Sequence, residues 1–433
     1  MTGAAARPAT PPVLGGAAVP AGLLARAHAA AAELARRGVR EGSRVAVEGG
    51  SHDLLAWFLG ADLLGAATLV VEPRWTPRER AAVVVAAGPD LVAHPAEPAP
   101  DGHEDTSAGH TAVAPAGEDR TAFYLPTTSG SSGRPTVLQR SRDSWLRSFA
   151  ALGPVSGPVL IAGPLSSSLF LFGALHALWC GAELRLGRAT DARGAAAVHV
   201  VPAMLADLVA AQERAPAPAA LRTVVCGGAH LGEGLRARFA RAFPGAELVE
   251  YYGSAEHSLI AIRRGAGLRP VPGVDLQLRD GTLWVRSPLA ADGALRAGRL
   301  DPAAEWTTVG DRADLHDGTL TVHGRGSAVI SSGGRLVAAE EVETVLREVP
   351  GVDDVVVTGT PHPRLGALVT AVVEGEPALA DLRAAARHAL EPGKRPRVWL
   401  RAKVLPRTAS GKPARAVIAE ELVAGVLDAE PLR

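Results

Sequence analysis

The sequence predicts an α/β protein: a large N-terminal domain of βαβ layers with a small β-rich subdomain, followed by a small α+β C-terminal domain. Three observations lead to this prediction. Short apolar runs alternate with longer helix-like stretches from residue 21 to residue 251, which is the pattern of parallel βαβ units. From 260 to 309 the pieces become short and β-rich, which indicates an antiparallel unit. The 433 residues also exceed one ordinary core, so two or more domains are expected.

The first elements follow from the spacing of apolar residues. Residues 21–37 place leucines and alanines on one helical face, and the stretch from 76 begins with Thr-Pro, which is a helix-start signal. In the first third of the chain we expect helix 21–37, strand 44–47, helix 53–64, strand 67–71, helix 76–87, strand 91–93 and helix 141–152.

The alternation continues and then changes. The next expected elements are strand 159–161, helix 170–180, strand 183–186, strand 198–201, helix 202–213, strand 221–225, helix 232–243 and strand 248–251. From Gly324 a separate α+β unit is expected, with helices at 339–348 and 378–390 and a last helix from 414. The predicted domains are therefore residues 1–323 and 324–433.

A loop rich in hydroxyl groups lies between Tyr124 and Thr136, directly after a strand-like run. Between Thr127 and Gly133 it holds five hydroxyl side chains and two glycines in seven residues. Glycines let backbone N–H groups point inward, and hydroxyls add rotatable donors, so such a loop can hold phosphate. It is not a Walker loop, because no Gly-Lys-Ser/Thr ends it. Taken alone, the same composition also fits a flexible linker.

Five stretches resemble, in order, the motifs of the adenylate-forming (AMP-binding) superfamily, in its acyl-CoA synthetase and aryl-CoA ligase branch. Each match alone is weak, but their shared order over nearly the whole chain is a specific signal. The stretches are Thr128-Ser-Gly-Ser-Ser-Gly-Arg-Pro135, Tyr252-Gly-Ser-Ala-Glu256, Val309-Gly-Asp311, the block Gly324-Arg325 with Ser332-Gly-Gly334 and Glu341-Val-Glu343, and Pro406-Arg-Thr-Ala-Ser-Gly-Lys412-Pro-Ala-Arg415.

The resemblance implies that these stretches together activate a carboxylic acid with ATP. Glu256 would act in catalysis as the Mg²⁺ ligand. Lys412, the second catalytic residue, would neutralise the α-phosphate from a mobile C-terminal domain that turns about the hinge residue Ser327. The implied nucleotide contacts are Thr128, Ser129, Gly130, Ser131, Ser132 and Gly133 on the phosphates, Asp311 and Arg325 on the ribose, and Tyr252, Gly253, Gly228 and Ala229 around the adenine.

Three positions depart from the family's motifs. The lysine after the loop proline is Thr136 here, so one cation facing pyrophosphate is missing, and Arg134 or Arg140 is a candidate substitute. The threonine before the glutamate is Ala255, which removes a hydroxyl donor to the α-phosphate. Each lost donor in a water-poor site costs about 1–3 kcal/mol. The hinge position holds serine in place of the common Asp or Lys.

The stretch 163–172 indicates the kind of acid, because it matches the family segment that lies beside the acid. It contains no acidic residue, so an α-ammonium group would have no partner in it. We therefore expect an aryl or acyl acid rather than an α-amino acid. Ser167, Phe170 and Gly227 are the candidate contacts of this substrate. Gly334 lies in the turn that resembles the wall of a pantetheine tunnel, where CoA or a carrier-protein thiol would enter.

Composition limits the partners. Lys+Arg and Asp+Glu both total 45, so nothing indicates a nucleic-acid or membrane-surface partner. Cys180 and Cys226 show neither metal nor disulfide spacing, which fits a reducing cytoplasm. No signal peptide or membrane-length apolar run is found, so a cytoplasmic location is expected. Heavy use of Ala, Gly, Arg and Pro suggests GC-rich bacterial coding.

Three functions remain open. The first is an acid–thiol ligase that forms an acyl-AMP with ATP and Mg²⁺ and transfers the acyl group to CoA or to carrier-protein pantetheine. The second uses an amine acceptor and makes an amide. The third is a catalytically degenerate homologue that only binds an acyl ligand. Thr136 and Ala255 favour the third function, whereas the retained motif residues, Lys412 among them, oppose it.

Overall fold

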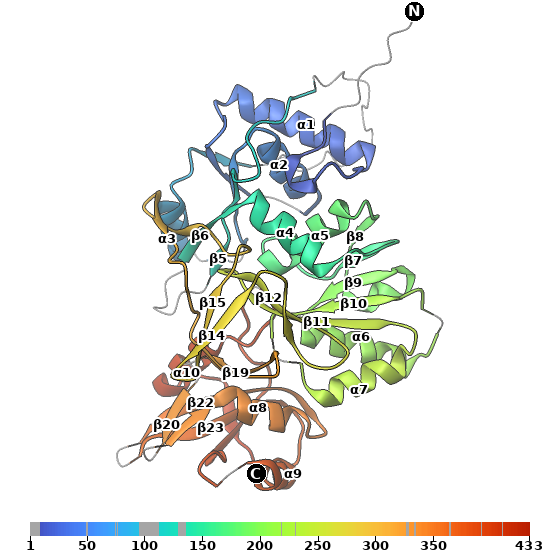
Figure 1. Cartoon of the computed structure of the whole chain (residues 1–433). Helices are drawn as coiled ribbons and strands as arrows, with labels where there is room; N and C mark the ends of the chain where they lie inside the picture. Colours follow the sequence, from blue (N-terminus) through green and yellow to red (C-terminus); the bar gives the residue numbers. More distant parts are fainter. Residues whose placement is uncertain are drawn as a thin grey trace, which may run out of the picture.

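The structure, a computed structural model, describes residues 9–48, 51–73, 75, 77–94, 112–128, 136–217, 219–229, 231–325, 329–332, 335–362, 365–390, 392–408 and 410–433. It confirms the predicted fold class: a large N-terminal part of βαβ layers carries a small β-sheet unit, and a small α+β domain follows. In Figure 1 the N-terminal helices (blue) lie at one end of the molecule and the C-terminal domain (orange to red) lies at the other.

The first sheet contains the N-terminal βαβ units. Its helices and strands are α1 (Ala21–Arg36), β1 (Arg44–Val47), α2 (Ser51–Leu63), β2 (Ala67–Val70), α3 (Pro77–Ala87), β3 (Leu91–Ala93), β4 (Ala122–Tyr124), β5 (Thr127–Thr128), β6 (Thr136–Ser141), β16 (Gly293–Arg296) and β17 (Arg299–Pro302). The strand order is β17-β16-β6-β4-β2-β1-β3, with β5 paired to β6. Strands β1 to β4 are parallel and β6 and β16 are antiparallel. The predicted phosphate loop therefore leaves the carboxyl edge of this sheet, where α/β proteins usually bind ligands.

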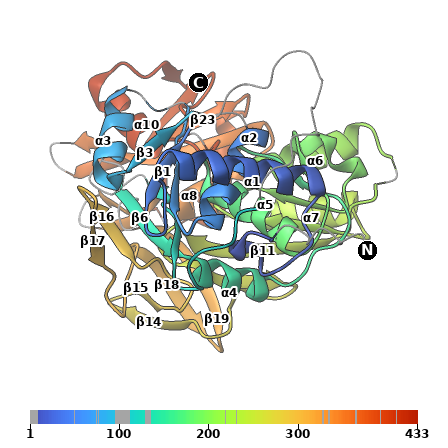
Figure 2. The same cartoon turned by 90° about the horizontal axis from the view of Figure 1, so that it is seen from above.

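The second sheet is mostly parallel. Its helices and strands are α4 (Arg142–Leu152), β7 (Val159–Ile161), α5 (Ser168–Trp179), β8 (Leu184–Leu186), β9 (Ala197–Val200), α6 (Pro202–Arg214), β10 (Thr223–Cys226), α7 (Glu233–Ala242), β11 (Glu247–Ser254), β12 (Ser258–Arg264) and β13 (Arg269–Pro270). The order is β13-β12-β11-β10-β9-β7-β8. Because β10 and β11 are parallel neighbours, the loop after Cys226 and the turn after Tyr252 emerge at the same edge. Figure 2 shows α1, α5 and α7 from above.

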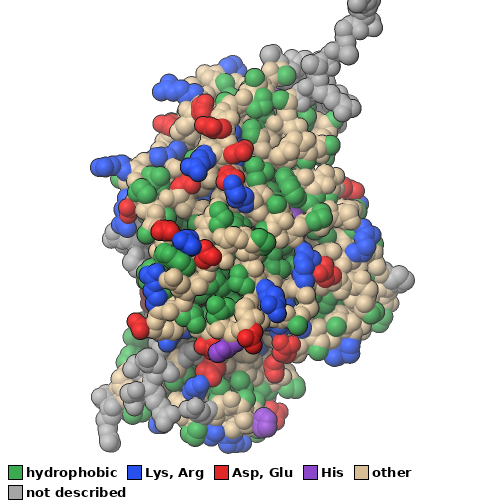
Figure 3. Space-filling view, in the orientation of Figure 1, with side chains coloured by type: hydrophobic (Ala, Val, Ile, Leu, Met, Phe, Trp, Pro, Cys, Tyr) green, Lys and Arg blue, Asp and Glu red, His purple; other side chains and the backbone are tan. Residues whose placement is uncertain are grey.

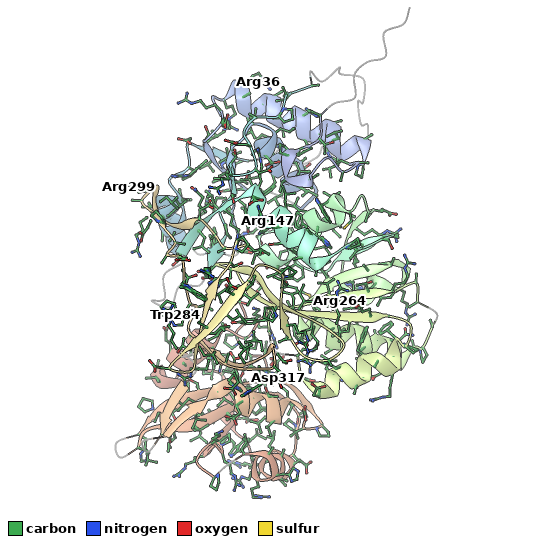
Figure 4. The ribbon with its side chains drawn as sticks, in the orientation of Figure 1. Arg36, Arg147, Arg264, Trp284, Arg299 and Asp317 are labelled. Carbon is green, nitrogen blue, oxygen red and sulfur yellow. The ribbon has the colours of Figure 1, made fainter. Side chains whose placement is uncertain are left out.

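A small antiparallel sheet packs beside these layers, and an isolated antiparallel bridge between Leu268 and Leu320 joins the two. That sheet has the order β14-β15-β18-β19, with β14 (Asp275–Arg279), β15 (Thr282–Arg286), β18 (Asp311–His316) and β19 (Thr319–Arg325), and it confirms the antiparallel unit that the sequence predicts. Arg264 on β12 donates from Nη2 to the carbonyl oxygen of Leu152, 2.6 Å away, and so ties β12 to the end of α4 (Figure 4). On the small sheet, the Arg279 guanidinium lies 4.3 Å from the ring centroid of Trp284, also labelled in Figure 4.

In its described residues, the C-terminal domain is a mixed sheet with three helices. Its elements are β20 (Val329–Ser332), β21 (Arg335–Ala338), α8 (Ala339–Arg347), β22 (Val352–His362), β23 (Gly366–Gly375), α9 (Leu379–Ala389), β24 (Val398–Ala402), α10 (Arg415–Ala424) and β25 (Ala429–Pro431). Its buried apolar residues run from Ile330 to Ile418 and form clusters of their own, whereas the other clusters run from Val13 to Leu320. This separation supports the predicted domain boundary near 323, which stays a prediction.

The surface carries charges of both signs. Figure 3 shows Lys and Arg side chains interspersed with Asp and Glu over the face seen in Figure 1. Within the described part of the chain, none of the helices is both long and apolar enough to cross a bilayer.

Candidate active site

The ends of the predicted phosphate loop are held together. Thr128 on β5 lies opposite Thr136 on β6 in antiparallel register. The residues between them, including the predicted phosphate contacts Ser129, Gly130, Ser131, Ser132 and Gly133, lie outside the described residues, as does Arg134. The structure therefore fixes where the loop starts and ends, and the roles of its hydroxyls and glycines stay a prediction.

A strained turn carries the predicted magnesium ligand. At Gly253 the register of β11 against β12 shifts, and an added Cβ there would overlap the carbonyl oxygen of Ser258. Ser258 itself has a φ of 58°, in the left-handed region that non-glycine residues rarely adopt. The turn from Tyr252 to Ser258 therefore needs glycine at 253 for steric reasons.

Glu256 lies in this turn, where a hydrogen bond holds its backbone and its carboxylate can bind a metal ion. Its carbonyl oxygen accepts a hydrogen bond from the N–H of Ala291, 2.7 Å away. The side chain is half-buried, and among the described residues its carboxylate receives no hydrogen bond. Carboxylate oxygens are the donors that Mg²⁺ prefers, usually one or two of them together with substrate phosphates. Glu256 therefore fits a magnesium ligand.

Arg140 lies behind Glu256 and is fully buried, with 1 % of its surface exposed. Its Nε and Nη2 donate to the carbonyl oxygen of Ala255 at 3.1 and 2.8 Å. Its Nη1 donates to the carbonyl oxygen of Leu289 at 2.7 Å and to Ser144 Oγ at 3.2 Å. These bonds correct the expectation that Arg140 replaces the missing loop lysine, because its donors point at the protein backbone and not at a phosphate site. Burial lowers the pKa of Arg140 to about 10, opposed by Asp292 and Glu256.

The predicted ribose pair is brought together by β18 and β19. Asp311 begins β18 and Arg325 ends β19, and the two are partners in antiparallel register. Asp311 is 5 % exposed and accepts a hydrogen bond from the hydroxyl of Tyr252, which comes from β11 in the second sheet. The predicted adenine and ribose residues therefore meet, although they are 59 residues apart in the chain.

Lys412 crosses from the C-terminal domain to the N-terminal part. A Cβ added at Gly228 would lie 3.3 Å from both Cε and Nζ of Lys412 and 2.9 Å from Cδ1 of Leu169. Gly228 has a φ of +85°, so the loop after β10 turns here in a conformation that favours glycine. Next to it, Gly227 packs under the ring of Tyr251, where an added Cβ would overlap the ring. The described Ala229 follows in the same loop.

Two arginines hold the turn that carries Lys412. On one side Arg407 donates to Asp354 at 2.9 Å, to Glu374 at 2.8 Å and to the carbonyl oxygen of Gly411 at 3.1 Å. On the other side Arg415 pairs with both carboxylate oxygens of Glu343, at 2.5 and 2.9 Å. Bidentate arginine–carboxylate pairs are geometrically specific, so they fix the turn on its own domain.

The predicted acid-binding stretch differs in detail from expectation. Helix α5 begins at Ser168, and Phe170 is fully buried with its ring against Gly163, so it packs in the core and is not an open pocket wall. Leu169, one residue earlier, instead reaches Gly228. One step along a helix rotates a side chain by about 100°, which explains the exchange. Ser167 precedes α5 and is half-buried.

The fold also brings an acidic residue to this stretch. Ser166 Oγ donates to a carboxylate oxygen of Glu72, 2.5 Å away, and Glu72 follows β2 in the first sheet with 7 % exposure. Because Glu72 lies outside 163–172, the residues of that stretch gave no sign of it. Tyr124 from β4 also reaches the start of α5, with its hydroxyl 2.9 Å from Ser168 Oγ, and burial raises the pKa of Tyr124 to about 12.

Like the predicted phosphate contacts, the hinge residue Ser327 and the tunnel residue Gly334 lie outside the described residues. The residues that sequence reasoning missed are Leu169 and Glu72, and it gave Arg140 a role different from the backbone anchor that the structure shows. Of these, only Leu169 had a sequence signal, since it directly precedes a predicted contact.

Comparison with known proteins agrees with this geometry. The family model described as AMP-binding enzyme matches residues 21–293, and the model of the AMP-binding enzyme C-terminal domain matches residues 341–412. An uncharacterized acyl–CoA ligase of Bacillus subtilis, YhfT, is 28% identical over 83% of this chain and 84% of its own length. A salicylyl-CoA synthase / salicylate adenylyltransferase of a Streptomyces species is 31% identical over 63% of this chain and 57% of its own length.

The fold is shared with solved structures. A single-residue variant of Escherichia coli MenE with bound OSB-AMS superposes with a TM-score of 0.79 at 23% identity, over 93% of this chain and 92% of that one. Nearly two-thirds of the chain matches the first family model, and the second model covers the domain that carries Lys412. The chain belongs to the family of AMP-binding enzymes.

Proposed function

We propose that this protein is an ATP-dependent acid–thiol ligase. The carboxylate of the acid attacks the α-phosphorus of ATP, which forms acyl-AMP and releases pyrophosphate. A thiol of CoA, or of pantetheine on a carrier protein, then attacks the acyl carbon and releases AMP. The observation that supports the proposal is that Lys412 lies beside Gly228, because this brings a cation of the C-terminal part next to a loop that we assign to the nucleotide.

Each proposed residue meets a different part of the nucleotide. The loop from Thr128 to Gly133 binds the β- and γ-phosphates, Asp311 and Arg325 bind the ribose hydroxyls, and Tyr252 lies against the adenine. Lys412 neutralises charge that develops on the α-phosphate during the first step, where preorganised electrostatic groups contribute most. When Mg²⁺ is bound, it neutralises phosphate charge, and Glu256 is the residue that would hold it.

The proposed substrate is an aryl or acyl acid. The relative from Streptomyces supports an aryl acid, since its printed activity concerns salicylate. Leu169 gives the site an apolar side chain beside Gly228. Amino acids are less strongly disfavoured as substrates than the sequence suggested. A carboxylate oxygen of Glu72 lies 2.5 Å from Ser166 Oγ in the acid-binding stretch, so an acidic partner for an ammonium group is near.

An ATP–pyrophosphate exchange screen tests the proposal. It should cover aryl, short-chain and medium-chain acids, with amino acids as the comparison. We expect exchange with at least one aryl or acyl acid, followed by thioester formation when CoA or a pantetheine-bearing carrier protein is added. Exchange with amino acids alone would refute the substrate assignment. No exchange with any acid, in a sample that binds ATP, would refute the ligase and favour the binding protein.

A further inference from the structure

Arg140 is a buried charge that the proposed reaction does not use directly. It lies on β6, the strand that follows the phosphate loop, and its guanidinium is removed from water. A buried charge is costly unless its hydrogen bonds are satisfied. Here the bonds go to two backbone carbonyls and one hydroxyl, so the guanidinium holds main chain in place.

The main chain that it holds is that of Glu256. The carbonyl of Ala255 belongs to the peptide group that joins Ala255 to Glu256, and two N–H groups of Arg140 bind it. The next peptide group is fixed as well, because the Glu256 carbonyl accepts the N–H of Ala291. Thus both peptide groups that flank the Cα of Glu256 are anchored, which leaves the side chain to move by its own rotations.

The two anchors belong to one assembly. Arg140 also binds the carbonyl oxygen of Leu289, two residues before Ala291, and the N–H of Asp292 donates to the carbonyl oxygen of Gln139 at 2.8 Å. The segment 289–292 is therefore joined both to β6 and to the Glu256 turn. Removal of Arg140 would release the Ala255 carbonyl and leave the turn tied to β6 only through segment 289–292.

The turn needs such support. It contains the register shift at Gly253 and the left-handed Ser258, and local strain of this kind persists only where the surroundings hold it. Its Ala255 has no side-chain hydroxyl that could bond to a neighbour. Asp292 and Glu256 are the carboxylates whose charge stabilises that of Arg140.

We propose that Arg140 is a positioning residue that fixes the backbone of Glu256 and thereby sets the affinity of the site for magnesium-bound nucleotide. It acts through Glu256 and does not touch the nucleotide. The proposal rests on the proposed function for the role of Glu256, but binding alone tests it. Residues that orient a metal ligand typically change metal affinity by roughly 10- to 100-fold when they are replaced.

The test compares Arg140→Met and Arg140→Lys with the matched control Arg142→Lys. Arg142 lies two residues further along, is equally buried, and pairs with Asp62 at 2.7 Å, away from Glu256. Calorimetric titrations would measure the binding of Mg·ATP and of ATP in the presence of EDTA, and thermal unfolding would be recorded for each variant. We expect Arg140→Met to weaken Mg·ATP binding by roughly 10- to 100-fold, with metal-free ATP binding nearly unchanged.

Arg140→Lys should lose less Mg·ATP affinity than Arg140→Met, because the ammonium can still bind one of the two carbonyls. If Arg140→Met does not fold, Arg140→Lys alone carries the test. Arg142→Lys should lower the melting temperature without changing the ratio of the two affinities. In a Glu256→Gln background, where the metal ligand is already lost, replacement of Arg140 should no longer change that ratio.

Equal losses of Mg·ATP and metal-free ATP binding in the Arg140 variants would overturn the proposal, and so would the same loss in Arg142→Lys or a full effect in the Glu256→Gln background. Failure of the ligase reaction itself is a separate result. A wild-type protein that binds Mg·ATP but catalyses no exchange would refute the proposed function and still allow the Arg140 comparison.

Discussion

Replacement of Lys412 by alanine should abolish formation of acyl-AMP and spare the later step. The Nζ of Lys412, on the C-terminal domain, lies beside Gly228, which we assign to the nucleotide site. In the proposed reaction its ammonium would face charge that develops only while the α-phosphate is attacked. Attack by a thiol on a preformed acyl-AMP develops its charge on the acyl carbonyl, so the same ammonium should matter little there.

The size of the effect follows from the electrostatics. A unit charge about 4 Å from a phosphate oxygen, at the effective dielectric of a partly buried site, interacts by about 4 kcal/mol. Measured losses of one preorganised group at a developing oxyanion are about 2.7–4 kcal/mol, which corresponds to roughly 10²- to 10³-fold in rate. We therefore expect pyrophosphate exchange to fall by at least about 10²-fold.

The assay separates the two half-reactions. Pyrophosphate exchange would measure the first, and thioester formation from supplied acyl-AMP would measure the second. Lys403→Ala is a matched control, since Lys403 is an exposed lysine on the same domain. Equal loss in both half-reactions, or loss in neither, would refute the role given to Lys412.

Three further results should follow. His176 and His199 are buried and neutral, and burial lowers their pKa values from 6.5 to about 4 and about 3. Below pH 6.5 the unfolded chain therefore binds more protons than the folded chain. The free energy of unfolding should fall as the pH drops toward 4, by roughly 3 kcal/mol for His176 alone. Calorimetric melting from pH 7 to 4.5 would show this fall, His176→Gln should reduce it, and a constant melting temperature would contradict it. Phe170→Ala should cost about 3–5 kcal/mol of stability in urea unfolding and leave the order of preferred acids unchanged. Leu169→Ala should instead alter the KM for the acid in pyrophosphate exchange. A changed acid preference in Phe170→Ala with little loss of stability would show that Phe170 lines the acid pocket. Gly253→Ala brings a Cβ into overlap with the Ser258 carbonyl oxygen. The substitution should displace the turn, lower the free energy of unfolding by about 1–3 kcal/mol and weaken Mg·ATP binding in calorimetry. A wild-type affinity would show that the turn adapts to the added methyl group.

Most helices and strands could be predicted because their apolar residues repeat with the right period. The helix predicted at 21–37 forms as α1 at Ala21–Arg36, and the strand predicted at 44–47 forms as β1. The small shifts matter only near the site. Helix α5 begins two residues before the predicted start, and within it Leu169 reaches the loop after β10 while Phe170 packs against Gly163.

The relations between distant residues could not be predicted from periodicity. Asp311 and Arg325 become partners because β18 and β19 pair in one particular register. Glu72 follows β2 of the first sheet and Ser166 precedes α5 beside the second, and no spacing in the sequence encodes their hydrogen bond. The resemblance to a family supplied the pair Asp311 and Arg325, but it supplied neither Glu72 nor the anchoring role of Arg140, whose partners are backbone carbonyls of other segments.

Thr136 and Ala255 depart from the family motifs, and Arg140 is connected to both. This connection favours an enzyme over a degenerate homologue. Thr136 opens β6, and four residues later the same strand supplies Arg140, whose donors hold the carbonyl of Ala255. A site under no constraint would lose polar groups, since an unsatisfied buried charge costs several kcal/mol. Here the interior holds a charge whose donors are satisfied, beside a carboxylate that fits a magnesium ligand. That arrangement fixes the backbone of Glu256, and a fixed backbone limits where the carboxylate can lie, which matters to a protein that binds magnesium-bound nucleotide.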